Sequence, residues 1–308
     1  MTTLLAGPIT AGCVNQQSHS AQVVGTPRPK LDLAPRPRRL STPDENAGIS
    51  PNKLTSAQAI NELRAERDAY YRNAEQEVYR SVREVLAQRK TDLERGLRQH
   101  IIVRGNPNRK QLALTFDDGP HPKYTPKILA ILGRYNIKGT FFLVGKQAEK
   151  YPDLVRAEAA AGHNIGNHTY HHVSLPKIPQ AYVADEIKAC GDVLKNVLGR
   201  PAHLFRPPGG EYTPSVAEAS EALGYTMVLW TDDPGDYASP GKGVILRRTL
   251  ETASPGGIIL MHDGIDQTIA VLPALIESLQ AKGYQFVTVD DLITSGMDQS
   301  LSDAATAK

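Results

Sequence analysis

The sequence predicts a parallel α/β fold over residues 101–295, either an open sheet or a barrel, and two observations support this. Seven short apolar runs typical of buried strands alternate with six stretches of helical length. Gly or Pro marks most junctions between them, as at Gly162, Gly224 and Pro255-Gly256-Gly257. Strands that alternate with crossover helices are predicted to lie parallel in one sheet, because each helix returns the chain to the same edge.

The residues before this region fall into two parts. Residues 1–55 are rich in Pro, Ser, Arg and Asn, lack apolar periodicity and are predicted to form a disordered linker. Residues 56–100 are predicted to be helical, because residues 56–98 contain no Gly or Pro before Gly96 and have apolar residues at helical spacing. This long amphipathic helix either self-associates through residues 56–98 or packs on the following domain, and both alternatives remain open.

The third part contains the predicted α/β elements, followed by residues 296–308 as a disordered tail. The predicted strands are Leu112–Phe116, Thr140–Val144, His163–Gly166, His203–Phe205, Thr226–Trp230, Gly257–Met261 and Gln285–Val289. The predicted helices are residues 125–135, 147–161, 180–198, 214–223, 243–253 and 268–281.

Charge is distributed unevenly along the chain, although the net charge is only +2. Residues 1–110 carry 18 Lys and Arg against 11 Asp and Glu, whereas residues 111–308 carry 17 against 22. The basic front part either lies near an anionic membrane or wall polymer or is a solvated arm without a partner. The acidic remainder argues against nucleic-acid binding. No segment approaches the roughly 18 apolar residues that a membrane span needs.

The two cysteines, Cys13 and Cys190, cannot form a disulfide framework. Cys190 is expected in the core side of a helix. Cys13 follows "LLAGPITAG", which resembles the end of a bacterial lipoprotein signal, although no positive charge precedes it and Thr10 stands where an aliphatic residue is usual. If the resemblance holds, the protein is extracytoplasmic in a bacterial cell envelope, tethered to the membrane through lipidated Cys13. If it does not, the protein is cytoplasmic.

Polar residues gather just after the carboxyl ends of five predicted strands. In a parallel α/β barrel these ends share one face, and the active site is built there. The residues are Asp117 and Asp118, His168 and His172, Arg206, Asp233 and Asp236, and His262.

The residue types indicate metal chemistry. His168 and His172 are four residues apart, so on a helical turn both imidazoles reach one ion. With one carboxylate of the Asp117–Asp118 pair they form a His₂Asp set with open positions, which is typical of catalytic zinc. The second Asp then remains available as a base. The metal and a cation such as Arg206 offset the repulsion between the adjacent carboxylates.

Five motifs follow one another in register: "TFDDGP", "HTYHH", "RPPGG", "DDPGDY" and "ILMHD". In this respect the chain resembles carbohydrate esterase family 4, the polysaccharide deacetylases with a NodB homology domain, over roughly residues 110–295. The resemblance implies a distorted (β/α)7 barrel for residues 101–295. Two positions depart from the family pattern, because Gly209 replaces an aromatic residue and Tyr237 stands where Trp is common.

The resemblance also implies the residue roles. Asp118, His168 and His172 would hold a divalent metal, usually zinc, and Asp117 would be the general base, paired with Arg206. His262 would be the general acid, with Asp233 orienting it and raising its pKa. The expected oxyanion and substrate-binding residues are Gly209, whose N–H would face the oxyanion, Tyr237, and Trp230, which is expected first in the core and second in the pocket.

The implied reaction is metal-dependent hydrolysis of N-acetyl groups from an N-acetylglucosamine-type polymer, such as peptidoglycan, poly-N-acetylglucosamine or a chitin-like glycan, releasing acetate. An O-acetyl esterase acting on acetylated polysaccharide is the alternative within the same fold. A non-catalytic cell-wall-binding or scaffold protein is the alternative from another class. That last hypothesis predicts damaged motifs, and none of the catalytic positions is lost here.

Overall fold

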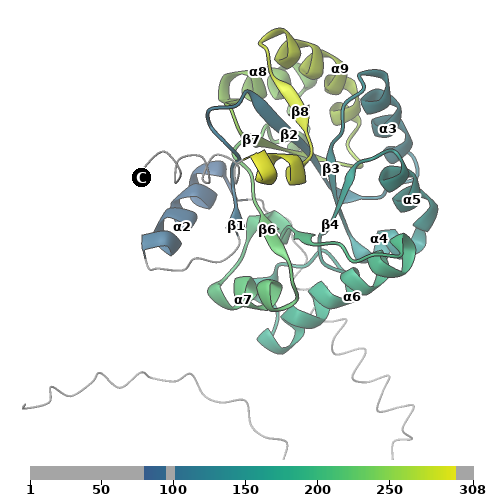
Figure 1. Ribbon diagram of the computed structural model, residues 1–308, viewed down its shortest axis with the longest axis vertical. Coiled ribbons are helices and arrows are strands. Elements are labelled where there is room, and N and C mark those ends of the chain that lie inside the picture. The colour runs from purple at the N-terminus through teal and green to yellow at the C-terminus, as the bar shows by residue number, and fades with distance from the viewer. Residues whose placement is uncertain (1–79, 95–100, 296–308) are drawn as a thin grey trace, which may run out of the picture. The chain divides into compact units, whose positions relative to one another are not determined.

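The structure is a computed structural model that describes residues 80–94 and 101–295 (Figure 1). The predicted linker 1–55 with Cys13, most of the predicted helix 56–98 and the predicted tail 296–308 lie outside the described residues. Within the described part of the chain, no helix combines the length and the apolar character required to span a bilayer.

All seven predicted strands are present in one parallel sheet, together with a short strand that the sequence analysis did not anticipate, β1. In the described residues the neighbour order is β1-β6-β5-β4-β3-β2-β7, and β8 also pairs with β2. The strands are β1 (Ile101–Ile102), β2 (Gln111–Gly119), β3 (Thr140–Leu143), β4 (Asn164–Asn167), β5 (Leu204–Phe205), β6 (Thr226–Val228), β7 (Gly257–His262) and β8 (Gln285–Val287).

The sheet closes into a distorted barrel, which confirms the expected architecture. The segment after β6 returns to β7: Thr231 N–H and Asp232 N–H both donate to Ile258 O, at 3.0 and 3.1 Å, and Asp232 bridges Ile259. β7 therefore has neighbours on both sides. The barrel is distorted at β2. On one edge of β2 lies β7, whereas the other edge is shared: β8 pairs with the start of β2 and β3 pairs with its end.

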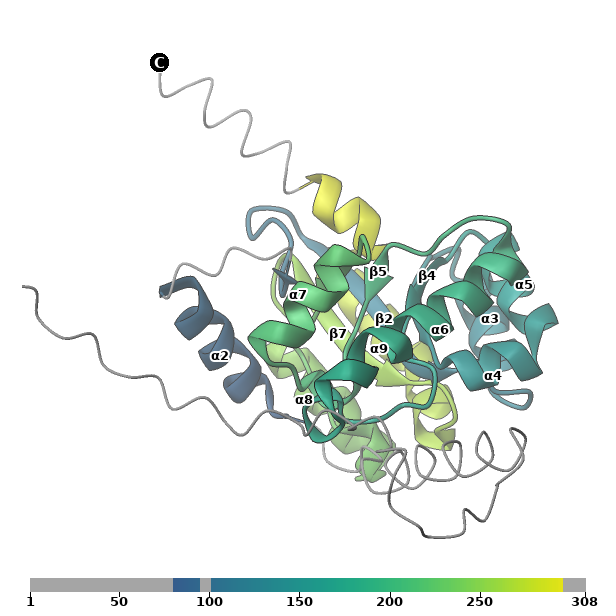
Figure 2. The ribbon, with the colours of Figure 1, turned by 90° about the horizontal axis from the view of Figure 1, so that it is seen from below.

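Helices surround the strands in both views (Figures 1 and 2). The predicted helix 147–161 is two helices, because Pro152 lacks an N–H donor and disfavours helical geometry at Tyr151. The barrel helices are α3 (Thr125–Arg134), α4 (Gly145–Lys150), α5 (Pro152–Ala160), α6 (Gln180–Leu198), α7 (Pro214–Ala222), α8 (Lys242–Thr252) and α9 (Asp266–Ala281).

The alternation of strand side chains divides the core into two clusters. Ala113 and Phe142 belong to one, and their neighbours Leu112 and Phe141 belong to the other. Cys190 is fully buried in the second cluster, as expected.

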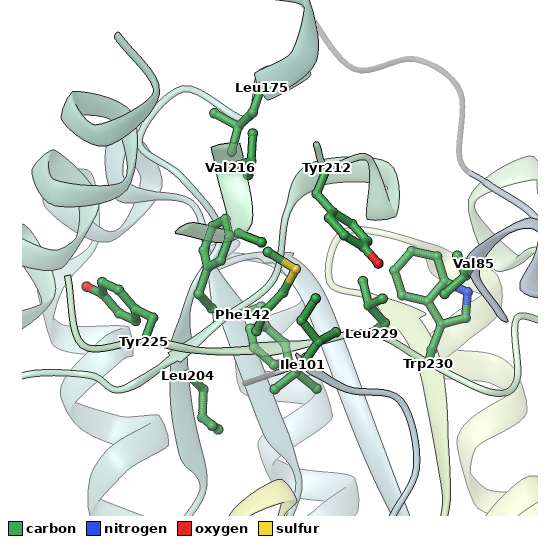
Figure 3. Close-up of a cluster of buried hydrophobic side chains, with 14 of the residues drawn as sticks. Val85, Ile101, Phe142, Leu175, Leu204, Tyr212, Val216, Tyr225, Leu229 and Trp230 are labelled. Atoms are coloured by element: carbon green, nitrogen blue, oxygen red, sulfur yellow. The ribbon is translucent and has the colours of Figure 1, made fainter. Parts of the chain in front are cut away.

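The helix that precedes the barrel is described from Val82 to Glu94 as α2. Its Val85 is fully buried in the first cluster, beside Tyr212 and Trp230 (Figure 3). For this part of the predicted helix 56–98, the contact supports packing on the barrel. Self-association through residues 56–98 stays a prediction.

Candidate active site

The two adjacent aspartates at the end of β2 have different surroundings. β2 continues through Asp117 and Asp118 to Gly119, with a bulge in its pairing with β3. Asp118 has φ +74°, a left-handed conformation that is uncommon outside glycine. A bulge re-aims side chains, and here the Asp117 side chain is 2 % exposed whereas that of Asp118 is 31 % exposed. The neighbouring carboxylates therefore contact different groups.

His168 and His172 follow β4 in an irregular loop. The expected helical turn is wrong, because residues 168–172 are not helical and both Thr169 and His172 have positive φ, +63° and +58°. Side chains organise the loop instead. Asn167 Oδ1 accepts a hydrogen bond from Thr169 N–H at 2.9 Å, and Thr169 Oγ1 accepts one from His172 N–H at 3.1 Å. The two imidazole centroids are brought to 4.9 Å.

These two histidines converge on Asp118. His168 Nε2 and His172 Nε2 lie 3.5 and 3.0 Å from Asp118 Oδ1, and neither nitrogen has a hydrogen-bond partner among the described residues. His168 Nδ1 lies 2.7 Å from the Arg206 carbonyl oxygen. Because a carbonyl only accepts, Nδ1 carries the proton and Nε2 keeps a lone pair for a metal.

The donor set fits a divalent metal ion. The ligand atoms of Asp118, His168 and His172 all lie within 4.8 Å of one another, and two imidazoles with one carboxylate suit zinc with open positions. Burial raises the pKa of Asp118, but His172 and His168 outweigh it and hold that pKa well below its usual range. His171, the neighbour of His172 in the sequence, turns away from this cluster, with its Nδ1 2.7 Å from Glu186 Oε1.

Arg206 lies fully buried against Asp117. Its Nη1 donates to Asp117 Oδ1 at 2.7 Å and to Thr115 Oγ1 at 2.8 Å. Its Nε and Nη2 donate to the carbonyls of Val228 and Leu229 at 3.2 and 3.3 Å. A buried ion pair in which every guanidinium nitrogen has an acceptor holds the carboxylate in one orientation. The pairing expected between Asp117 and Arg206 is therefore present in the structure.

His262 ends β7 in a second buried pair. Its Nδ1 lies 2.7 Å from Asp236 Oδ1, and Asp236 Oδ2 accepts from His262 N–H at 2.8 Å and from Thr268 Oγ1 at 2.5 Å. Burial lowers the pKa of His262, but the charges of Asp236, then Asp118 and Asp117, outweigh it and raise that pKa to about 9. The imidazole therefore carries a proton at neutral pH, as a general acid requires.

Asp236 occupies the place that the sequence analysis assigned to Asp233, and this corrects that prediction. Asp233 Oδ1 instead accepts from Gly235 N–H at 2.9 Å. Gly235 has φ +72°, and the chain reverses at Pro234-Gly235 before Asp236 returns toward His262. A signal for this was available, because an Asp directly before Pro-Gly commonly caps its own turn, which leaves the Asp after the turn for other contacts.

The three residues expected to border the substrate differ in exposure. Tyr237 is partly exposed and meets the His262 ring edge-on, with centroids 5.3 Å apart. Gly209 is buried in the loop after Arg206, with φ +62°. Trp230 is 1 % exposed, which confirms the first expectation, a place in the core, and does not support the second, a contact with substrate. Its ring instead supports the loop, since a Cβ on Gly210 would lie 2.6 Å from it.

Known proteins resemble this chain in sequence and in fold. The profile of the polysaccharide deacetylase family matches residues 104–228. A peptidoglycan-N-acetylglucosamine deacetylase of Bacillus cereus is 38% identical over 191 residues, 60% of this chain and 89% of that protein. A chitooligosaccharide deacetylase of Bradyrhizobium sp. is 34% identical over 192 residues, 57% of this chain and 87% of that protein. The crystal structure of the Bc1960 peptidoglycan N-acetylglucosamine deacetylase has a TM-score of 0.64 at 32% identity, covering 67% of this chain and 98% of its own. The chain therefore belongs to the polysaccharide deacetylase family and is an enzyme of that family.

Proposed function

We propose that this protein hydrolyses N-acetyl groups on an N-acetylglucosamine-type polysaccharide, such as peptidoglycan, poly-N-acetylglucosamine or a chitin-like glycan, and releases acetate. The observation that carries this proposal is the convergence of Asp118, His168 and His172 next to a buried carboxylate held by arginine and a buried imidazole held by aspartate. The names of the two relatives, which act on peptidoglycan and on chitooligosaccharides, support this class of substrate.

Asp118, His168 and His172 would hold the metal, for which we propose zinc. When bound, such an ion supplies a Lewis acid for the acetyl carbonyl and lowers the pKa of water. Asp117 takes the proton of the attacking water. Arg206 holds Asp117 Oδ1 at 2.7 Å, so the proton goes to Oδ2, which lies 3.7 Å from His168 Nε2 on the side of the ligand cluster.

His262 supplies the proton that the departing amine needs. Its pKa of about 9 keeps the imidazole protonated at neutral pH, and Asp236 orients the ring through Nδ1, so Nε2 delivers the proton. The Gly209 N–H is proposed to donate to the oxyanion that forms on the acetyl group. Tyr237, edge-on to His262, is proposed as a wall of the substrate groove.

Acetate release from N-acetylglucosamine oligomers, compared with release from acetylated xylan, tests this function. We expect release from the oligomers, loss of release after chelation and recovery when zinc is returned. Release from acetylated xylan alone would instead identify an O-acetyl esterase. A purified protein that binds no metal and releases no acetate from any of these glycans would contradict the proposal and favour a non-catalytic wall-binding protein.

We further propose that the enzyme works in a bacterial cell envelope, tethered through lipidated Cys13, which lies outside the described residues. The resemblance of "LLAGPITAGC" to a lipoprotein signal supports this. Cys13→Ser is then expected to move the protein from the membrane fraction to the soluble fraction. A wild-type protein that is already soluble and retains Met1 would contradict the tether and favour a cytoplasmic location.

A further inference from the structure

The loop that carries Gly209 contains two consecutive glycines in the left-handed conformation. Gly209 and Gly210 have φ +62° and +68°. A glycine pair has more backbone freedom than any other pair of residues. A loop that must present an N–H in one orientation therefore needs support from elsewhere, and the structure shows where that support comes from.

Residues 80–92, which precede the barrel, contact three residues of this loop, Gly209, Gly210 and Tyr212. Arg80 N–H donates to the Gly209 carbonyl at 3.1 Å, and Arg80 Nη1 lies 3.5 Å from the Gly210 carbonyl. Gln88 Nε2 donates to the Tyr212 carbonyl at 3.1 Å, and Gln88 Oε1 also accepts from Arg80 Nη1. A segment that lies before the first barrel strand thus donates to the carbonyls of Gly209, Gly210 and Tyr212.

A buried side-chain contact anchors the same segment. Tyr212 Oη donates to Asp92 Oδ2 at 2.7 Å, and both residues are 5 % exposed. Val85, on the same helix, is fully buried in the cluster that contains Tyr212 and Trp230 (Figure 3). A buried, charge-assisted hydrogen bond fixes its partners more firmly than an exposed one. The helix therefore cannot leave the loop without exposing an apolar residue and breaking this bond.

We propose that residues 80–92 are a positioning element of the active site, which holds residues 207–213 so that the Gly209 N–H keeps one orientation. Arg80 acts through its backbone N–H, and Gln88 and Asp92 act through their side chains. None of the three touches substrate in this proposal. The role assigned to the Gly209 N–H rests on the proposed deacetylase function, whereas the support of the loop by residues 80–92 does not.

Loss of this support should slow turnover without removing the metal. Removing one donor to an oxyanion typically costs 10²–10³ in rate, and a displaced donor loses part of that, so we expect kcat to fall by about tenfold or more. The metal ligands belong to β2 and to the loop after β4, neither of which residues 80–92 hold. Metal affinity is therefore expected to stay unchanged.

The test uses the full-length protein and three variants. Asp92→Leu removes the acceptor for Tyr212 Oη, whereas Asp92→Asn keeps an acceptor oxygen. Glu94→Leu changes an exposed residue of the same helix, for which the described residues show no contact with the loop. We expect Asp92→Leu to lower kcat on N-acetylated oligomers and on an acetyl ester to the same extent, since both reactions pass through an oxyanion. Asp92→Asn should restore most of the rate, and Glu94→Leu should match wild type. Each rate is measured at a temperature at which that variant is folded.

Hydrogen–deuterium exchange of residues 207–213 provides a readout that does not depend on activity. We expect faster exchange there in Asp92→Leu and unchanged exchange in Glu94→Leu. Unchanged exchange in Asp92→Leu would overturn the inference. It would also be overturned if Asp92→Leu showed faster exchange but a wild-type kcat, or if this variant lost its bound metal. If the wild-type protein releases no acetate from any glycan, the proposed function fails, and the exchange data still decide whether residues 80–92 hold the loop.

Discussion

Replacing Asp236 by Asn should remove the charge that keeps His262 protonated at neutral pH. The two groups are almost completely buried, and His262 Nδ1 lies 2.7 Å from Asp236 Oδ1. Asn is close to Asp in shape, and its amide oxygen still accepts from Nδ1–H. The substitution therefore changes the charge beside the imidazole more than it changes the position of the ring.

The size of the effect follows from the pKa of His262. It is raised from 6.5 to about 9, and this difference corresponds to about 3 kcal/mol in favour of the protonated ring. Two unit charges about 4 Å apart interact by about 4 kcal/mol at an effective dielectric constant near 20. The charge of Asp236 is thus large enough to account for the rise. Without it, burial is opposed only by the smaller effects of Asp118 and Asp117, so the pKa of His262 should return toward its ordinary value of 6.5.

The pH dependence of kcat/KM on an N-acetylglucosamine oligomer measures this change. A general acid acts only while it is protonated, so its pKa sets the basic limb of the profile. At pH 8 a group with a pKa of about 9 is mostly protonated, whereas one with a pKa of about 6.5 is about 3 % protonated, so the rate should fall by up to about 30-fold. A metal bound at Asp118 would offset part of the negative charge and lower the pKa of His262 in both proteins. The basic limb of Asp236→Asn would still lie at a lower pH than that of wild type.

Asp233→Asn is the matched control, because Asp233 lies three residues away and bonds Gly235 N–H instead of His262. It should leave the basic limb in place. A basic limb that moves in Asp233→Asn and stays in Asp236→Asn would refute the assignment made from the structure. Asp236→Asn also deprives His262 N–H of an acceptor, so thermal unfolding is measured in parallel to separate a loss of folding from a loss of protonation.

The same pKa has a consequence for stability. Because folding raises the pKa of His262 from 6.5 to about 9, the stabilisation by its charge is fully present below about pH 6.5 and is lost as the pH rises through about 9. The Tm of wild type should therefore fall relative to the Tm of Asp236→Asn as the pH rises over this range.

Three further predictions concern the aspartate pair, the glycine loop and a buried acid. Asp118→Asn should lose metal and activity together, whereas Asp117→Asn should keep the metal and lose about 10²–10⁴ in kcat. Metal analysis and kinetics distinguish the two variants, and loss of metal in Asp117→Asn would contradict the assignment of Asp118 as ligand and Asp117 as base. Gly210→Ala should lower the free energy of unfolding by about 2–4 kcal/mol in denaturant titration, because a residue with a Cβ is strained at φ +68° and that Cβ would meet the Trp230 ring at 2.6 Å; wild-type stability would refute the packing. Burial raises the pKa of the fully buried Glu158 well above its usual value, so its contribution to stability is present below about pH 4.5 and is lost as the pH rises. The Tm of Glu158→Gln should therefore rise relative to that of wild type between pH 4 and 8, and a Tm difference that does not change with pH would contradict this.

The sequence alone was sufficient for the seven predicted strands and for the group of polar residues at one end of them. Each barrel strand is a short apolar run that ends in a polar or turn residue, and such patterns are local. The seven predicted strands are therefore all present, within a few residues of their predicted ends. Asp118, His168 and His172 converge as expected, because the carboxyl ends of parallel strands meet at one face of a barrel.

The sequence could not determine how the chain runs between those strand ends. Asp233 and Asp236 are both candidates by position, and the reversal at Gly235, with φ +72°, decides which one reaches His262. The spacing of His168 and His172 suggested a helical turn, but side-chain hydrogen bonds from Asn167 and Thr169 give a different backbone. In loops, single dihedral angles redirect everything that follows them, and these angles respond to contacts that are distant in sequence.

Burial and long-range contacts were likewise decided only by the tertiary structure. Trp230 follows a strand at the mouth of the barrel, yet it is enclosed beneath Gly210. Asp92 looks like one of many charged residues on an amphipathic helix, but it is buried against Tyr212, 120 positions away. Periodicity shows which face of an element is apolar, whereas the identity of the surface that covers it depends on how all the elements pack together.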